Sequence, residues 1–314
     1  MKLLTNHNLK KLIKLIGYLF LIVGLVALYY APLEIYCYYM FTDIGPLYSE
    51  HFNFGTLLFA ILVISNISYY LVALFLIPIG IGLIRLHNWV RKLSINLIYI
   101  CIISVGSTLA SFVFSIPKLR DDLTIMLIFA IIIASLITIA ISFLFIKLIN
   151  SNKMVSLFHK KVNLISKISQ TTLLIITLNF LVTIVFHISI FIKGIFPLFG
   201  RFIFFPSSVH LTASAIFALI ILTYLYLKKN IIGLWGMIVY YLTFLISVIL
   251  TFSKYSTSGI ILLLDYSKYE NENVLPSLSI FTDLNLTIVI SVFITTIIGL
   301  TILSKKHFQE SNKS

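Results

Sequence analysis

Apolar and polar positions alternate in long blocks along this chain of 314 residues. Eight apolar runs each have about the 20 residues that a helix needs to span a bilayer, or more. They predict helices at 15–33, within 56–84, and at 93–116, 123–146, 168–192, 209–227, 231–252 and 284–303. We therefore expect an all-α, polytopic integral membrane protein with about eight transmembrane helices. We expect the first run to be an uncleaved helix.

The second apolar run is long for a single span, and three polar residues interrupt it. They are Ser65, Asn66 and Ser68. One interpretation is a single tilted helix. The other, which we slightly favour, is an interfacial segment near 51–64 followed by a span from about Ile67. The later residues Pro78, Gly80 and Gly82 are expected to kink or loosen this helix.

Charges separate onto alternate sides of these runs. Of the 23 Lys and Arg residues, 17 fall on one side and 6 on the other, and nine of the 10 acidic residues accompany the six. Basic residues favour the cytoplasmic side of a membrane. We therefore predict a cell-membrane protein with both termini in the cytoplasm. The predicted outer acids are Glu34, Asp43, Glu50, Asp121, Asp122, Asp265, Glu270, Glu272 and Asp283.

Composition agrees with the membrane class. The chain is 60% hydrophobic and only 11% charged, with a mean hydropathy of +1.09. Its net charge of +13 lies in short loops rather than in one basic domain. The expected partner is therefore the lipid bilayer, together with a membrane-protein partner or a second copy, and not nucleic acid.

The helices fall into two groups of similar rhythm. We predict a first membrane half at 1–150 and a second at 151–314, which begins with a cytoplasmic linker. Four spans in each half would make them parallel repeats, although any eight-helix chain shows some such rhythm. Within the linker, Phe158, Val162 and Ile165 alternate with lysines and favour a short amphipathic surface helix.

Small and polar residues recur on single helix faces. Examples are Ser104, Ser107 and Ser111 in the third run, and Thr243, Ser247 and Thr251 in the seventh. Such stripes allow close helix packing, and the alternative is a hydroxyl-lined path for a small solute. We expect the intramembrane amides Asn66, Asn96 and Asn179 to form hydrogen bonds between helices.

Reactive side chains are sparse. Charged residues fall in predicted loops or near helix ends, which disfavours a proton- or ion-driven carrier. His187 and His210 flank one outer loop but have no nearby third ligand, so no metal site is assigned. Cys37, in a predicted outer loop, and Cys101, in a helix, are not expected to form a disulfide.

The leading functional hypothesis is a non-catalytic, permease-like component for a small or lipidic solute. One alternative is a structural or immunity-type subunit of a membrane complex. A second alternative is a lipid-linked transferase at the outer face, which would use the carboxylates of Glu34, Asp43, Glu50, Asp121 and Asp122. We assign no catalytic, cofactor-binding or metal-binding residue, and we expect no cofactor.

Overall fold

The structure of the chain is a computed structural model. It describes residues 6–41, 45–47, 57–115, 122–158, 168–191, 194–255, 286–305 and 308. Within this part of the chain, eight helices are long and apolar enough to cross a membrane. This confirms the predicted all-α, polytopic membrane class.

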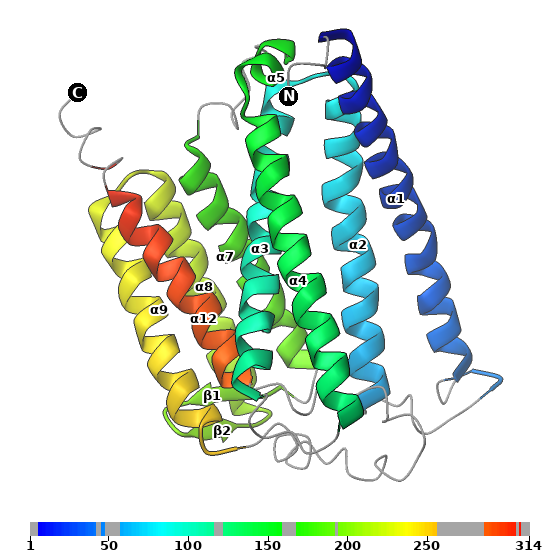
Figure 1. Ribbon diagram of the computed structural model, residues 1–314. Coiled ribbons are helices and arrows are strands. Elements are labelled where there is room, and N and C mark those ends of the chain that lie inside the picture. The colour runs from blue at the N-terminus through cyan, green and yellow to red at the C-terminus, as the bar shows by residue number, and fades with distance from the viewer. Residues whose placement is uncertain are drawn as a thin grey trace. The chain divides into compact units, whose positions relative to one another are not determined.

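The eight long helices coincide with the eight apolar runs (Figure 1). Their bounds are α1 Asn6–Phe41, α2 Leu57–Ile84, α3 Asn88–Ser115, α4 Asp122–Ile149, α7 Gln170–Phe191, α8 Ser207–Leu227, α9 Ile231–Phe252 and α12 Leu286–Leu303. The agreement is closest for α9, which has the bounds that its apolar run predicts. Each helix satisfies its own backbone hydrogen bonds, as a spanning segment must in lipid.

Helix α2 is continuous from Leu57 to Ile84, so it has no break before Ile67. Residues 51–56 of the predicted interfacial segment lie outside the described residues, and that segment stays a prediction. The polar residues in its middle find partners without a break in the helix. Ser68 Oγ donates to Ile64 O, one turn earlier, at 2.7 Å. Asn66 Nδ2 donates to Ala31 O of α1 at 2.6 Å. The helix also continues through Pro78.

Helix α1 extends to Phe41, eight residues beyond its predicted end. Glu34 and Cys37 therefore lie within a helix and not in an outer loop, which corrects both predictions. Aromatic contacts with α2 accompany the extra turns. In these turns the ring centroids of Tyr38 and Phe59 are 5.3 Å apart, and within the predicted run Tyr30 stacks on Tyr69 with centroids 6.4 Å apart. These contacts depend on α2, so the end of the apolar run does not reveal them.

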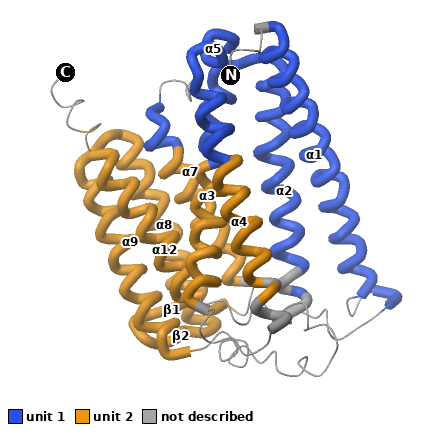
Figure 2. The backbone as a smooth tube through the Cα atoms, viewed as in Figure 1, with its two compact units in different colours: residues 1–98, 142–173 blue, residues 99–141, 174–314 orange. Residues whose placement is uncertain are grey.

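The chain groups into two compact units (Figure 2). Unit 1 comprises residues 1–98 and 142–173, and unit 2 comprises residues 99–141 and 174–314. The helices α3, α4 and α7 each contribute residues to both units. The expected division into membrane halves 1–150 and 151–314 stays a prediction.

Unit 1 is built on the packing of α1 against α2. Where Gly17 meets Gly80, a Cβ atom on Gly80 would lie only 2.7 Å from Gly17 O, so the two backbones approach more closely than larger residues permit. The short helix α5, Asn152–Leu157, completes the core. Met154 of α5 and the following Phe158 are buried with Leu9 of α1 and residues of α2.

The expectation of a surface helix in the linker is thus met only in part. A short helix is present, but Met154 and Phe158 contribute to the core of unit 1 and not to a membrane-facing surface. Val162 and Ile165 lie outside the described residues.

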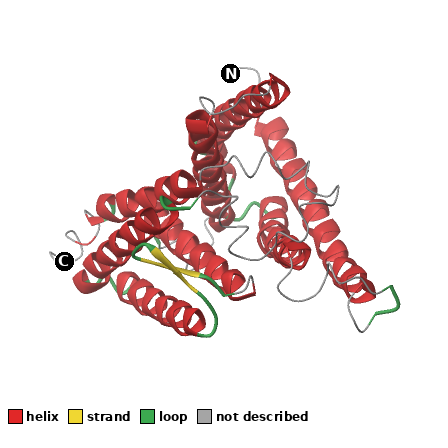
Figure 3. Cartoon of the chain, turned by 90° about the horizontal axis from the view of Figure 1, so that it is seen from below, coloured by secondary structure: helices red, strands yellow, loops and turns green. Residues whose placement is uncertain are grey.

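Unit 2 packs α7, α8, α9 and α12 around a core that includes Leu178, Tyr226 and Tyr241. It also contains a hairpin that the helix pattern does not predict. Strands β1, Phe196–Leu198, and β2, Arg201–Ile203, pair antiparallel at the end of the unit 2 helices (Figure 3). The two residues between them, Phe199 and Gly200, both have positive φ, at 40° and 91°, as a type I′ turn requires.

Candidate functional site

Unit 2 contains an apolar cavity of about 420 Å³. Its walls come from α3, α7, α9 and α12, and the hairpin contributes Phe196, Pro197 and Phe202. This volume lies within the range of about 300–1,000 Å³ that small-molecule sites occupy. No lining residue carries a charge.

Packed aromatic rings define much of the cavity wall. Phe186 of α7 and Phe244 of α9 meet edge to face, with ring centroids 5.2 Å apart. Phe202 of β2 and Phe252 of α9 form a second edge-to-face pair at 5.2 Å. Such pairs favour a particular ring geometry in addition to burying apolar surface. The wall is therefore shaped by contacts between helices and hairpin.

Hydroxyl groups in the cavity lining are directed mainly at their own helices. Ser107 Oγ donates to Ile103 O at 2.8 Å, and Ser189 Oγ donates to Phe186 O at 2.8 Å. Ser104 also lines the cavity, and its hydroxyl forms no hydrogen bond with a described residue. The cavity thus suits an apolar molecule with few polar groups.

The serine stripe predicted in the third run is only partly associated with the cavity. Ser104 and Ser107 line it, whereas Ser111 is fully buried and is not part of the lining. A hydroxyl-lined path along the whole stripe is therefore not present in this part of the structure.

The stripe of the seventh run has a different role, because it holds the hairpin. Ser247 Oγ donates to Pro197 O at 2.8 Å and accepts from Phe199 N at 3.0 Å. Thr251 Oγ1 accepts from Gly200 N at 2.9 Å. The third member, Thr243, is exposed. Two small polar residues on α9 therefore fix a wall of the cavity.

Asn179 links three helices beside the cavity, as predicted. Its Oδ1 accepts from the Tyr241 hydroxyl of α9 at 2.7 Å, and its Nδ2 donates to Thr223 Oγ1 of α8 at 2.8 Å. Tyr241 itself lines the cavity. Asn179 is only 2% exposed, so its amide needs hydrogen-bond partners within the protein, and these two bonds supply them.

The two other intramembrane amides also form bonds between helices. Asn66 connects α2 to α1 as described above. Asn96 of α3 accepts a hydrogen bond from Gln170 Nε2 of α7, and the same nitrogen donates to Lys92 O at 2.9 Å. Gln170 lies near the start of the predicted run 168–192, and its role was not predicted because its partner Asn96 belongs to another helix.

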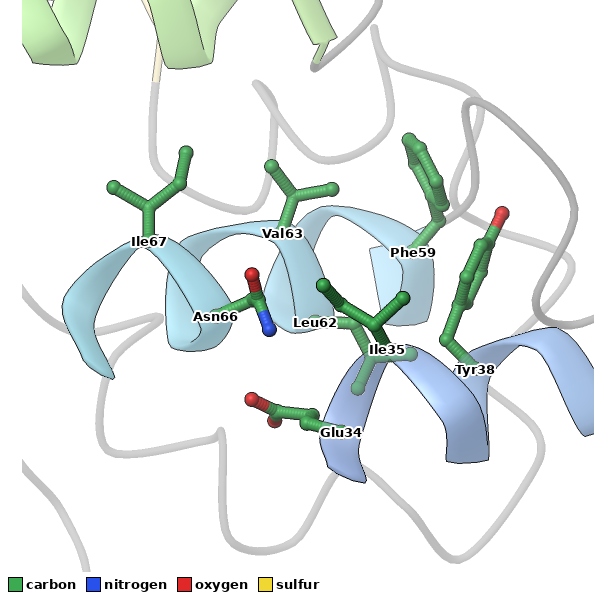
Figure 4. Close-up of a pocket in the computed structure, with 8 residues that line it drawn as sticks. All are labelled: Glu34, Ile35, Tyr38, Phe59, Leu62, Val63, Asn66 and Ile67. Carbon is green, nitrogen blue, oxygen red and sulfur yellow. The ribbon is translucent and has the colours of Figure 1, made fainter. Parts of the chain in front are cut away.

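A second cavity, of about 140 Å³, lies between α1 and α2 in unit 1 (Figure 4). Its lining is apolar except for Glu34, Tyr38 and Asn66. One carboxyl oxygen of Glu34, Oε2, is enclosed and accepts no hydrogen bond from the described residues. Glu34, a predicted outer acid, thus lies in a cavity.

The remaining candidate residues do not assemble into a reactive site within the described part of the chain. Asp43, Glu50 and Asp121 lie outside it, and Asp122 is the first residue of α4. His187 Nδ1 donates to Thr183 O at 2.7 Å, and His210 is exposed. No three described His, Cys, Asp or Glu residues come together as metal ligands.

No family model matches this chain, and neither a curated protein nor a solved structure is significantly similar to it.

Proposed function

We propose that this chain is a non-catalytic, permease-like component of the cell membrane and that its substrate is a lipidic solute. The observation that carries the proposal is the uncharged, aromatic-walled cavity of about 420 Å³ in unit 2. A hydrocarbon chain of the solute can enter such a space from lipid or water, and its entry buries no unpaired charge. The hydroxyl of Ser104 supplies a polar contact.

Proposed orientation follows from the distribution of charge. In unit 2, Lys228 lies over the ring of Tyr224 at 5.6 Å, and Lys305 lies over the ring of Trp235 at 5.2 Å. Aromatic rings and basic residues are enriched together at the membrane–water interface, and basic residues favour the cytoplasmic side. We therefore propose that this end faces the cytoplasm, with both chain termini on the same side.

The experiment measures transbilayer movement of a fluorescent, short-chain phosphatidylcholine in liposomes that contain the purified full-length chain. A membrane-impermeant quencher reports how much labelled lipid reaches the outer leaflet. We expect faster movement than in protein-free liposomes. Equal rates in the two preparations would rule out this proposal for the probe lipid class.

Two valines on α9 provide a matched pair of variants. Val248 is 1% exposed and lines the cavity, whereas Val239 is 60% exposed. Val248→Phe adds the volume of a phenyl ring inside the cavity and is expected to slow lipid movement. Val239→Phe makes the same chemical change on the outer surface of the helix and is expected to leave the rate unchanged. Equal effects of both variants would place the path elsewhere.

A further inference from the structure

The cavity between α1 and α2 has a polar end and an aromatic end. Figure 4 shows Glu34 and Asn66 together at one end, which we call the carboxyl end, and Tyr38 and Phe59 at the other, which we call the aromatic end. Aliphatic side chains of both helices line the space between them. The arrangement is amphipathic within a very small volume.

Glu34 lacks a hydrogen-bond donor within this cavity. Its Oε2 is enclosed and accepts no hydrogen bond from a described residue. Figure 4 shows the amide nitrogen of Asn66 on the same side as the carboxyl, but this nitrogen donates to Ala31 O at 2.6 Å. An enclosed carboxyl oxygen to which no described residue supplies a donor or a counter-charge is costly. A bound cation with an N–H group would supply both.

We propose that this cavity binds a small organic ammonium ion. The ammonium group donates a hydrogen bond to Glu34 Oε2 at the carboxyl end, and the alkyl part of the ion lies against the rings of the aromatic end. A charge-assisted bond of this kind is about twice as strong as a neutral one. The site is separate from the apolar cavity of unit 2 and binds a different class of ligand.

The composition of the lining favours an organic cation over a metal ion. Calcium takes about six to eight oxygen ligands, and magnesium demands near-octahedral oxygen coordination. The lining offers side-chain oxygens from only Glu34, Tyr38 and Asn66, and its other members are hydrocarbon. An alkylammonium ion needs one anionic partner and an apolar surface, and this cavity provides both.

Cavity size limits the ligand. The volume of about 140 Å³ is close to that of an engineered cavity of roughly 150 Å³ that holds benzene. We therefore expect an ion of about six non-hydrogen atoms, such as butylammonium or pentylammonium. Affinity should rise about three- to fourfold per methylene from ethylammonium to butylammonium, as each added group is buried.

The position of Glu34 along α1 makes the site accessible from the membrane surface. The 36 residues of α1 span about 54 Å, whereas the hydrocarbon core is about 30 Å thick. The apolar run that ends at Leu33 is long enough to cross this core, so Glu34 lies close to the lipid–water boundary. An ammonium ion in water and the ammonium headgroup of phosphatidylethanolamine both reach this depth.

Binding is tested with the purified full-length chain in phosphatidylcholine nanodiscs. The thermal unfolding midpoint is measured as butylammonium chloride is added, because a ligand that binds the folded state raises this midpoint. Butan-1-ol serves as the neutral ligand of equal size, and sodium chloride controls for ionic strength. We expect a saturable rise with butylammonium that neither control reproduces. Equal rises with butan-1-ol or with sodium chloride would overturn the proposal.

Three variants locate the bound ion. Glu34→Gln keeps the shape of the side chain but removes its charge, and it should weaken butylammonium binding about tenfold or more. Val63→Phe retains Glu34 but fills the cavity, and it should weaken binding as well. Asp122→Asn removes one charge at the start of α4 and should bind as the unmodified chain does. Unchanged binding in either of the first two variants would contradict the site.

The source of the ammonium group is tested by changing the lipid. The lipid headgroup occupies the site if phosphatidylethanolamine nanodiscs abolish the rise in unfolding midpoint that butylammonium causes in the unmodified chain. The Glu34→Gln variant is the control, because its weak rise should not change with the lipid. An undiminished response assigns the site to a free amine. Both results require the same ammonium chemistry at Glu34.

Discussion

Ser247 of α9 binds Pro197 of β1 through a hydrogen bond of 2.8 Å from its hydroxyl to the proline carbonyl oxygen. The same hydroxyl oxygen accepts from the backbone N–H of Phe199, in the turn of the hairpin. One serine side chain thus joins a transmembrane helix to both the strand and the turn. Since Pro197 lines the unit 2 cavity, this bond also positions part of the cavity wall.

The Ser247→Ala variant should therefore destabilise the hairpin. It leaves a backbone carbonyl and a backbone N–H without their partner, at a cost of about 1–3 kcal/mol. Unfolding by a denaturing detergent, followed by tryptophan fluorescence in a Trp89→Phe background that leaves Trp235 of α9 as the sole tryptophan, measures the loss. Thr243→Ala is the matched control, because Thr243 belongs to the same stripe but is exposed. Equal stability of the two variants would show that the hairpin does not depend on this bond.

The hydrogen bond from Tyr241 to Asn179 should contribute measurably to the stability of unit 2. Tyr241→Phe removes the donor and leaves Asn179 Oδ1 buried without it. Hydrogen bonds between membrane helices contribute about 0.6 kcal/mol on average and up to about 1.7 kcal/mol. We expect a loss in this range in the same detergent unfolding assay. Tyr224→Phe, at a position 59% exposed, should be neutral. A neutral Tyr241→Phe would mean that another group replaces the donor.

The close contact between Gly17 and Gly80 predicts a specific intolerance to alanine. A Cβ on Gly80 would lie 2.7 Å from Gly17 O, which forces α1 and α2 apart. We expect Gly80→Ala to destabilise unit 1 by about 1–3 kcal/mol, as overpacking generally does. Circular dichroism during detergent unfolding measures this loss.

Gly106→Ala provides the control for that substitution. A Cβ on Gly106 of α3 would meet nothing within 4 Å. Alanine there should be neutral or stabilise the helix by up to about 1 kcal/mol, because glycine is a poor helix former. If both glycines tolerate alanine equally, α1 and α2 do not pack through this contact.

The proposed orientation is tested by cysteine labelling. Cys37 and Cys101 are first replaced by serine, and single cysteines are then placed at Lys161 and Tyr269. A membrane-impermeant maleimide added to intact cells should label the cysteine at 269 and should label the one at 161 only after permeabilisation. Labelling of both positions from outside would contradict the orientation inferred from charge.

The membrane class and the helix positions follow from the sequence because hydrophobic run length is a local property. Helix α9 has the bounds that its run predicts, and α12 begins only two residues later than expected. The amides could also be interpreted locally, since an amide in lipid needs a partner. Which partner each amide has, such as Tyr241 for Asn179, required the packed helices.

The position of Glu34 could not be predicted from the local apolar pattern. Glu34 directly follows Leu33, the last residue of the first predicted helix, and the apolar pattern placed it in a loop. The structure places it in α1 and encloses one of its oxygens. The scarcity of charges in the predicted helices therefore counts less strongly against ion coupling, because the Glu34 carboxyl lies inside α1 beside a cavity.

The sequence by itself determined that this is a helical membrane protein and where its spans lie. The tertiary structure decided that α1 continues to Phe41, that α2 has no break, and that a hairpin forms one wall of an apolar cavity. The physical reason is the distance along the chain over which each feature is determined. Spanning helices satisfy their own backbone and need only apolar length, whereas the cavities and the hairpin depend on contacts such as Tyr38 with Phe59 and Ser247 with Pro197. Such contacts join residues that are distant in the chain, so no local pattern contains them.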